Sequence, residues 1–272
     1  MKVIVRPPSA AFARALSEHA ERERIDVEAG GAQHAAFVGA LRAAGLDLIE
    51  LPPEPDLGDA CFPSDVLVAF TPAGEPQAGA ALLVATRPGA PSRRAEVASV
   101  AVCARELAPR AAFVEIEEPG TLDGGDVIVY GDRVAIGVSA RTNAAGAVQL
   151  ADRVRDLGYH PFLCPVTDRL HLASGVTVLR PTRLVGTAAG FASLDEASHL
   201  AAPREEVERL VLDDDDAVAA NVLALGGRCF IVAGYPRAVA LLAAHGETAV
   251  GLDLSEFTRA DGGPTCLVAI VP

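Results

Sequence analysis

Apolar residues of this chain fall in short runs that come in pairs. Residues 127–130 and 134–137 flank Gly131-Asp132-Arg133, a polar turn of the kind that joins two strands in a tight hairpin. Similar pairs lie at residues 176–179 and 183–186, and at residues 221–225 and 228–232. Their spacing of roughly 45 to 50 residues indicates a repeated supersecondary unit.

Helical periodicity marks the stretches that follow these hairpins. Within residues 143–157, one face at i, i+3, i+4 spacing is made of Ala147, Leu150, Ala151, Val154 and Leu157. The pattern therefore predicts two strands and a helix in each unit. Earlier copies are residues 66–70 and 81–85 with a helix near 92–107, and residues 3–5 and 48–51 with a helix around 32–44.

These copies amount to about five units. The final apolar run, residues 266–271, is expected to be a strand near the amino-terminal one, so a closed ring of five units is the economical arrangement. No linker or low-complexity segment divides the chain. We therefore expect a single domain over residues 1–272.

The composition narrows the class of protein. With 23 Lys and Arg against 36 Asp and Glu, the formal charge of −13 argues against binding nucleic acid. The chain is 50% hydrophobic, yet no run approaches the roughly 18 apolar residues of a membrane-spanning helix. Its first residues lead into a strand-like run rather than a signal-peptide core, so we expect a soluble, cytoplasmic protein. The five cysteines form no CxxC pair and should be free thiols.

Three residues in the predicted loops could together perform covalent catalysis. Cys266 stands at the predicted start of the last strand, His171 lies between two leucines that would point to the other face of a strand, and Asp123 opens an Asp-Gly-Gly-Asp turn. Alone, each has a commoner structural role, as a small buried apolar residue, a hydrogen-bonded histidine and a turn residue. Together they offer a thiol nucleophile, an acid/base and a carboxylate that orients it.

The same loops carry a surplus of arginines and aspartates. Arginine binds a carboxylate through two hydrogen bonds, and aspartates accept hydrogen bonds from a guanidinium, so this set suits a zwitterionic substrate with a cationic group. The motifs GxxxxGKS/T, GxGxxG, HExxH and GxSxG do not occur. The four aspartates at 213–216 are expected to begin a helix rather than to bind a cation.

Several strings occur in an order that is more specific than composition. The most specific are RPGAPSRR at residues 87–94, TLDGGDV at 121–127 and RTN at 141–143. They are accompanied by Gln33-His34, Leu51-Pro52, Asp59 with Phe62 and Asp65, Leu170-His171-Leu172 and Thr265-Cys266. In this order they resemble the dimethylarginine dimethylaminohydrolase family, and the resemblance spans nearly the whole chain.

The resemblance implies a fold and an activity. The family belongs, with arginine deiminases and amidinotransferases, to the guanidine-modifying (pentein) superfamily, whose fold is a five-bladed α/β propeller of strand-strand-helix-strand units. The implied reaction hydrolyses an Nω-substituted L-arginine, dimethylarginine or monomethylarginine first, to citrulline and an alkylamine. It passes through a covalent Cys-thiouronium intermediate and requires no metal or organic cofactor. The implied partner is a small-molecule arginine derivative, and monomer and homodimer both stay open.

The resemblance also assigns roles to residues. Cys266 is the nucleophile, His171 the general acid/base and Asp123 the residue that orients the histidine. The implied substrate-binding residues are Asp59 and Asp65 for the guanidinium, Arg93 and Arg141 for the α-carboxylate, and Phe62, Ser64, Ala260 and Asp261.

Two positions depart from the family pattern. The family usually has Phe-x-Glu-Asp at the guanidinium site, but Phe62-Pro63-Ser64-Asp65 has a hydroxyl in place of one carboxylate. In the first loop, where the family often presents a leucine to the substrate, the chain has His19-Ala20-Glu21. We expect these changes to affect the guanidino substituent, with N-hydroxyarginine as an alternative, rather than the reaction class. Glu21 could supply the missing charge.

Three other functions share parts of this residue set. An arginine deiminase would release ammonia from unsubstituted arginine, although members of that family are generally longer. An amidinotransferase would use the same cysteine, histidine and aspartate to pass the amidino group to an amine. A non-catalytic protein that binds an arginine derivative would not need both Cys266 and His171, so it is the least favoured.

Overall fold

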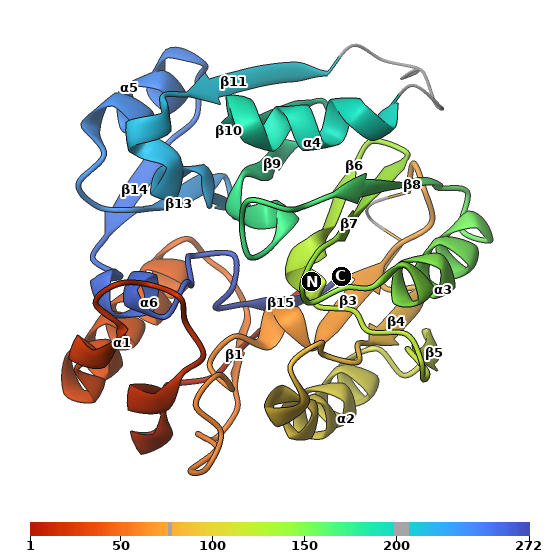
Figure 1. Cartoon of the computed structure of the whole chain (residues 1–272), viewed down its shortest axis with the longest axis horizontal. Helices are drawn as coiled ribbons and strands as arrows, with labels where there is room; N and C mark the ends of the chain where they lie inside the picture. The colour runs from red at the N-terminus through yellow and green to blue at the C-terminus, as the bar shows by residue number, and fades with distance from the viewer. Residues whose placement is uncertain (76–77, 199–206) are drawn as a thin grey trace.

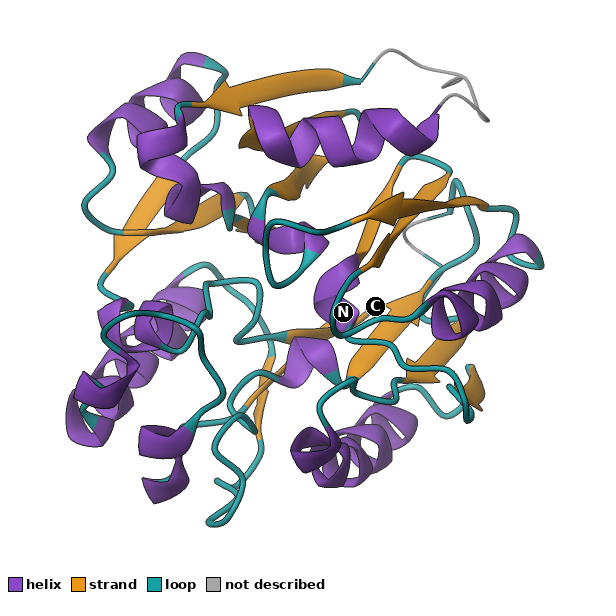
Figure 2. Cartoon of the chain, in the orientation of Figure 1, coloured by secondary structure: helices purple, strands orange, loops and turns teal. Residues whose placement is uncertain are grey.

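In the computed structural model, five three-stranded sheets form a ring around the middle of the molecule, and helices cover the outside of the ring (Figure 1, Figure 2). The structure describes residues 1–75, 78–198 and 207–272. The ring confirms the repeat count and the five-bladed α/β propeller expected from the sequence.

Every sheet has an inner, a middle and an outer strand. The inner strands are β3 (Leu67–Phe70), β6 (Val127–Tyr130), β9 (Val176–Arg180), β12 (Leu223–Leu225) and β15 (Ala269–Val271). The middle strands are β4 (Leu82–Ala85), β7 (Arg133–Val138), β10 (Arg183–Thr187), β13 (Arg228–Val232) and β1 (Lys2–Val5). The outer strands are β5 (Ala112–Glu115), β8 (His160–Pro165), β11 (Glu208–Leu212), β14 (Ala249–Leu252) and β2 (Leu48–Glu50). Each middle strand is antiparallel to its inner neighbour and parallel to its outer one.

One sheet combines the two ends of the chain and thereby closes the ring. Its middle strand β1 pairs antiparallel with β15, with Lys2 opposite Val271, and parallel with β2, with Val3 opposite Leu48. The predicted neighbourhood of the first and last strands is therefore confirmed.

A helix connects the middle strand of each sheet to the outer one, as a parallel pair requires. These helices are α1 (Val27–Ala43), α2 (Val97–Leu107), α3 (Ala144–Arg155), α4 (Ala188–Ser198) and α5 (Pro236–Ala244), and a short sixth helix is α6 (Ser255–Arg259). None of the helices in the described ranges is long and apolar enough to cross a membrane.

Local sequence explains where these elements begin and which face they bury. Asn143 caps α3 by accepting a hydrogen bond from the backbone N–H of Gly146, and Asp26 caps α1 in the same way. The buried face of α3 is Ala147, Leu150, Ala151 and Val154, as its periodicity predicts. At the β6–β7 hairpin, Gly131 adopts a φ of 54°, a conformation that glycine reaches without steric cost.

Apolar side chains of neighbouring sheets and helices pack together around the ring. One such core joins Phe12 and Phe37 of the first unit to Phe230 of β13 and Phe257 of α6. Another joins Phe70 of β3 to the buried face of α3. Because these cores lie between sheets, they fix the sheets relative to one another and hold the loops at one end of the ring in place.

Three local predictions were wrong. The last strand begins at Ala269 rather than Cys266, because Cys266 lies in a turn where its N–H donates to the carbonyl of Gly263. His171 is not within a strand; it precedes a 3-10 turn, Leu172–Ser174, and its carbonyl accepts a hydrogen bond from the N–H of Ser174. The helix expected near 92 begins as α2 at Val97, after a 3-10 segment, Pro91–Glu96.

Candidate active site

Loops at one end of the ring enclose a small cavity that both Cys266 and His171 line. We call it the buried cavity. Its volume of about 20 Å³ is close to the roughly 10–15 Å³ that one water molecule needs. The lining residues are Leu16, Asp59, Phe62, Asp65, Arg93, Arg141, Leu170, His171, Ala260, Asp261, Gly262 and Cys266. The structure thus brings together nine of the eleven residues singled out in the sequence, all except Asp123 and Ser64.

Asp123 lies behind the imidazole of His171 and is fully buried. Its Oδ2 is 3.1 Å from His171 Nε2, and its Oδ1 accepts a hydrogen bond from the backbone N–H of Gly89 at 3.0 Å. A second buried carboxylate, Asp126, accepts from the backbone N–H of Leu172 at 3.0 Å. One carboxylate therefore holds the imidazole ring directly, and a second one holds the backbone of the next residue.

The charge of His171 is set by these surroundings. Burial alone would lower the pKa of its imidazole, but Asp65, Asp123 and Asp126 outweigh burial and raise the pKa to about 9. Gly125 allows this close packing, because a Cβ at that position would lie 2.7 Å from His171 Nδ1. At neutral pH the imidazole is consequently protonated and can serve as an acid.

Cys266 lies in the turn before β15, with its sulfur among polar groups. The Sγ atom is 3.8 Å from Nδ2 of Asn221 and 4.0 Å from Oγ1 of Thr265. Asn221 fixes this turn, because its Oδ1 accepts hydrogen bonds from both the backbone N–H and the hydroxyl of Thr265. Burial, with the charge of Asp65 added, raises the pKa of the Cys266 thiol to about 11. In the free protein the sulfur is therefore a thiol at neutral pH.

Asp65 is buried between His171 and Arg93. Its Oδ2 accepts a hydrogen bond from Arg93 Nη1 at 2.7 Å, and its Oδ1 lies 4.0 Å from His171 Nδ1. Burial opposes ionisation of Asp65, but the charges of His171 and Arg93 outweigh it and hold the pKa of this carboxyl below its usual value. Asp65 therefore faces the cavity as a carboxylate.

Asp59 is the second carboxylate of the cavity wall, and burial raises its pKa. The backbone N–H of Leu16 donates to Asp59 Oδ1 at 3.0 Å, which ties the first loop to this side of the site. Leu16 itself lines the cavity. A leucine of the first loop therefore does face the site, three residues before His19-Ala20-Glu21.

Arg93 is less free to bind a substrate than the sequence predicts. Its guanidinium is buried and donates from Nε and Nη2 to Glu96 at 3.1 and 2.9 Å, besides its bond to Asp65. Nη2 also reaches the carbonyls of Asp59 and Phe62. Burial raises the pKa of Glu96 to about 7. The hydrogen bonds of Arg93 thus go to carboxylates and carbonyls of the protein itself.

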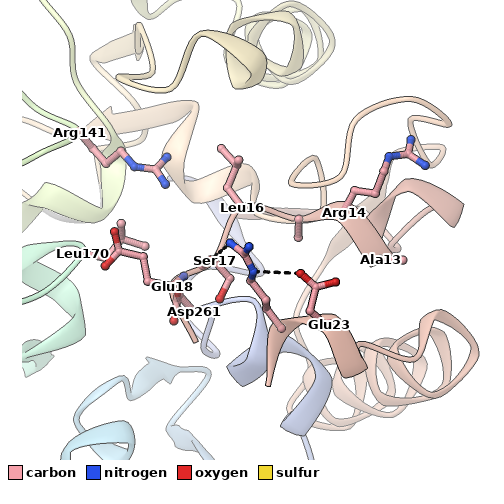
Figure 3. A pocket seen from close by; sticks show the side chains of 11 residues that line it. Ala13, Arg14, Leu16, Ser17, Glu18, Glu23, Arg141, Leu170 and Asp261 are labelled. Atoms are coloured by element: carbon pink, nitrogen blue, oxygen red, sulfur yellow. Dashed lines mark hydrogen bonds and ion pairs between the residues drawn. The ribbon is translucent and has the colours of Figure 1, made fainter. Parts of the chain in front are cut away.

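Arg141 lies at the mouth of the buried cavity, where a larger outer cavity of about 480 Å³ begins. The two cavities share Leu16, Arg141, Leu170 and Asp261. Figure 3 shows the guanidinium of Arg141 directed toward Leu16 across this outer cavity, with Arg14 on the far side. Within the described ranges, Arg141 pairs with Asp123 at 4.0 Å. Arg141 is thus the better placed of the two arginines to meet a carboxylate that enters from outside.

Ser64 does not line the buried cavity, so its expected contact with the substrate finds no support in this geometry. Its hydroxyl donates instead to the backbone carbonyl of Cys266 at 3.2 Å. Glu21, the expected replacement for the missing charge, instead pairs with Arg24 and Arg259.

Sequence reasoning missed three residues that position the site: Leu16, Glu96 and Asn221. Only Glu96 left a local signal, because it lies three residues after Arg93, one turn further along. The contacts of Leu16 and Asn221 cross 43 and 45 residues of sequence, to Asp59 and Cys266 respectively. Such contacts form only when the ring closes, so a short sequence motif cannot predict them.

One group of residues in the described part of the chain satisfies the distances of a metal site. Donor atoms of Asp65, Asp123 and His171 all lie within 4.8 Å of one another. Their hydrogen bonds account for the arrangement without an ion, because Asp65 accepts from Arg93 and Gly125, and Asp123 faces the imidazole. The arrangement is a histidine held between carboxylates, which is chemically suited to acid/base catalysis.

Comparison with known sequences gives related proteins along the whole chain. The family profile described as arginine deiminase matches residues 91–158. The N(G),N(G)-dimethylarginine dimethylaminohydrolase of Streptomyces coelicolor is 39% identical over 267 residues, which cover 98% of this chain and 95% of that protein. The protein of the same name from Pseudomonas aeruginosa is 30% identical, over 86% of this chain and 85% of its own.

Comparison with solved structures gives the same result. The dimethylarginine dimethylaminohydrolase of Pseudomonas aeruginosa, solved as a variant in complex with citrulline, superposes with a TM-score of 0.85 at 27% identity and covers 98% of this chain and 97% of that one. The amino-terminal domain of a cyanobacterial arginine dihydrolase superposes with a TM-score of 0.80 at 15% identity, a likeness of fold alone. The sequence matches, which extend over nearly all of the chain, show that it belongs to the dimethylarginine dimethylaminohydrolase family.

Proposed function

We propose that this protein hydrolyses Nω-substituted L-arginines, with dimethylarginine and monomethylarginine as its substrates, to citrulline and an alkylamine. The observation that carries the proposal is the buried cavity, in which Cys266 and His171 face the carboxylates of Asp59 and Asp65. The 39% identity to a protein named for this reaction supports the same activity. No step below requires a metal or an organic cofactor.

Substrate binding prepares the nucleophile. The guanidinium is a cation, and it would lie against Asp59 and Asp65 beside the sulfur of Cys266. A positive charge there favours thiolate over thiol and so lowers the raised pKa of Cys266. The α-carboxylate of the substrate would meet Arg141 at the mouth of the cavity. Arg93 would act mainly by holding Asp65 in place.

The first chemical step forms a covalent intermediate. The thiolate of Cys266 attacks the guanidinium carbon and forms a C–S bond. The C–N bond to the substituted nitrogen then breaks, and that nitrogen takes a proton from the imidazolium of His171 and leaves as a neutral amine. The enzyme now carries a cationic thiouronium and a neutral His171, and Asp123 keeps the imidazole oriented throughout.

The second step releases the product. A water molecule adds to the thiouronium carbon, and the C–S bond breaks to give the thiolate of Cys266 and the ureido group of citrulline. Two protons are freed, one of which returns to His171 while the other goes to solvent. The imidazole therefore acts first as an acid and then as a base, which suits its position between two carboxylates.

The same proposal covers the organisation of the protein. Residues 1–272 would form one catalytic domain, because the first and last strands share a sheet and the site draws on residues from Leu16 to Cys266. Its five free cysteines agree with the reducing cytoplasm. Monomer and homodimer are both compatible with a site built from one chain.

A substrate panel tests the proposal and separates its rivals. Asymmetric dimethylarginine, monomethylarginine and arginine are each incubated with the protein, and citrulline and the released amine are measured. We expect citrulline with equimolar alkylamine from the methylated substrates. Ammonia released from arginine alone would identify a deiminase. Transfer of the amidino group to added glycine would identify an amidinotransferase, and binding without product would identify a non-catalytic protein.

A further inference from the structure

A second cavity reaches Cys266 and His171 from the other side. This axial cavity runs along the middle of the ring, has a volume of about 290 Å³, and is walled by residues of all five inner strands, β3, β6, β9, β12 and β15. Figure 1 shows β3, β6, β9 and β15 around this middle. Apart from the two catalytic candidates, its described lining contains no titratable side chain. Asn221 adds an amide near the sulfur, and Ser64 adds a hydroxyl that donates to the carbonyl of Cys266.

The axial cavity ends at a third space on the far face of the ring. That far cavity, of about 700 Å³, is lined by the hairpin turns of Gly131 and Pro181. The two cavities share Val129, Val178 and Ala224, one residue from each of three inner strands. The boundary between them is therefore made of small, uncharged side chains.

Water is the expected content of the axial cavity. Each inner strand pairs with a middle strand on one side only, so the backbone N–H and C=O groups of its other edge face the axis and require a partner. A volume of about 290 Å³ far exceeds the roughly 10–15 Å³ that one water needs. The backbone edges offer the polar partners without which such a cavity would stay dry.

The buried cavity cannot supply this water once a substrate occupies it. Its volume is only about 20 Å³, and the substrate carbon and side chain would fill it from the side of Arg141. The covalent intermediate nevertheless needs one water at the carbon attached to Cys266. Cys266 and His171, which line the buried cavity, also line the axial cavity.

We propose that the axial cavity is a second route to the active site, by which water from the far face reaches the thiouronium intermediate on Cys266. The proposal rests on the proposed function, since it concerns the hydrolysis of that intermediate. The water enters past Val129, Val178 and Ala224, adds to the thiouronium carbon and gives a proton to His171. Substrate and citrulline pass through the outer cavity.

A graded obstruction at the boundary tests the route. Ala224→Val, Ala224→Leu and Ala224→Phe narrow it stepwise, so that the smaller changes keep a folded protein even if the largest does not. Val211→Phe is the matched control, because Val211 is a 53% exposed residue on the outer strand β11, away from the axis. Each variant is mixed with asymmetric dimethylarginine, quenched in acid at set times and analysed by mass spectrometry for the adduct on Cys266.

We expect the rate of adduct formation to match the control, while the steady-state fraction of adduct rises several-fold along the series and kcat falls with it. A flat adduct fraction across the series would overturn the route. Slower formation of the adduct with no change in the adduct fraction would also overturn the route, because that result indicates that the substitution distorts the buried cavity in which the substrate binds. Wild type that makes neither adduct nor citrulline would instead refute the proposed function on which the route depends.

Discussion

The carboxylate of Asp123 and the imidazole of His171 form a buried pair, with Oδ2 and Nε2 3.1 Å apart. The pair joins two units of the ring that are 48 residues apart in sequence. Because Nε2 is engaged, Nδ1 is the nitrogen left for proton transfer. The relation makes Asp123 a positioning residue for the proposed acid/base.

Replacing this carboxylate by an amide tests that role. We expect Asp123→Asn to lower kcat by at least about a hundredfold while the protein stays folded, because a general acid that is not correctly oriented loses a rate contribution of this size. The loss of one carboxylate should also lower the pKa of His171 and move the basic limb of the kcat profile to lower pH. Asp152→Asn on the exposed face of α3 is the control. An unshifted pH profile with near wild-type kcat would contradict the assignment.

The raised pKa of Cys266 predicts how the free enzyme reacts with alkylating reagents. Burial and Asp65 keep the sulfur protonated at neutral pH, so neutral iodoacetamide should modify Cys266 slowly at pH 7 and faster as the pH rises toward 11. A cationic chloroacetamidine should react faster at pH 7, because its charge favours the thiolate. A rate that does not change with pH between 7 and 9 would show that the thiolate already exists without substrate.

Arg141→Ala should weaken binding of the α-carboxylate. A bidentate contact of this kind contributes about 2–3 kcal/mol, roughly a 30-fold to 150-fold rise in KM, for methylated arginines. Alkylguanidines without a carboxylate should lose much less. The comparison of kcat/KM for both ligands checks this, with Arg153→Ala on α3 as the control. Equal losses for both ligands would remove Arg141 from the carboxylate site.

Arg93→Ala should act mainly on stability. Removal of this buried guanidinium takes from Asp65 and Glu96 the arginine that both of them bind, a loss of about 3–5 kcal/mol in the free energy of unfolding. Arg141→Ala should leave the free energy of unfolding almost unchanged, since the ion-pair partner of Arg141 among the described residues, Asp123, is 4.0 Å away. Denaturant unfolding of both variants checks the contrast. Equal stabilities would mean that Arg93 is not a structural residue of the cavity.

The fold follows from the sequence because its signals are local. The turn at Gly131 and the helix cap at Asn143 are each decided within a few residues, and their repetition gives the ring. The end of the chain was harder to predict. The apolar run from Cys266 resembles a strand. The N–H of Cys266, however, donates to the carbonyl of Gly263 in a turn, so β15 begins only at Ala269.

Only those site residues that belong to a specific sequence motif could be predicted. Cys266, His171 and Asp65 lie together as expected, since each is part of a specific string. The occupation of Arg93 by Glu96, and the turn of Ser64 toward the backbone of Cys266, depend on tertiary contacts that no spacing reveals. Burial then sets the charges of these groups, and burial is a property of the folded ring.

The covalent intermediate on Cys266 is the measurement that tests this account most directly. The protein is mixed with asymmetric dimethylarginine, quenched in acid within its first turnovers, digested and analysed by mass spectrometry. We predict that the peptide containing Cys266 carries the substrate less dimethylamine, that the adduct decays to citrulline, and that Cys266→Ser forms neither. Citrulline made without an adduct, or an adduct on Cys61, Cys103, Cys164 or Cys229, would contradict the account.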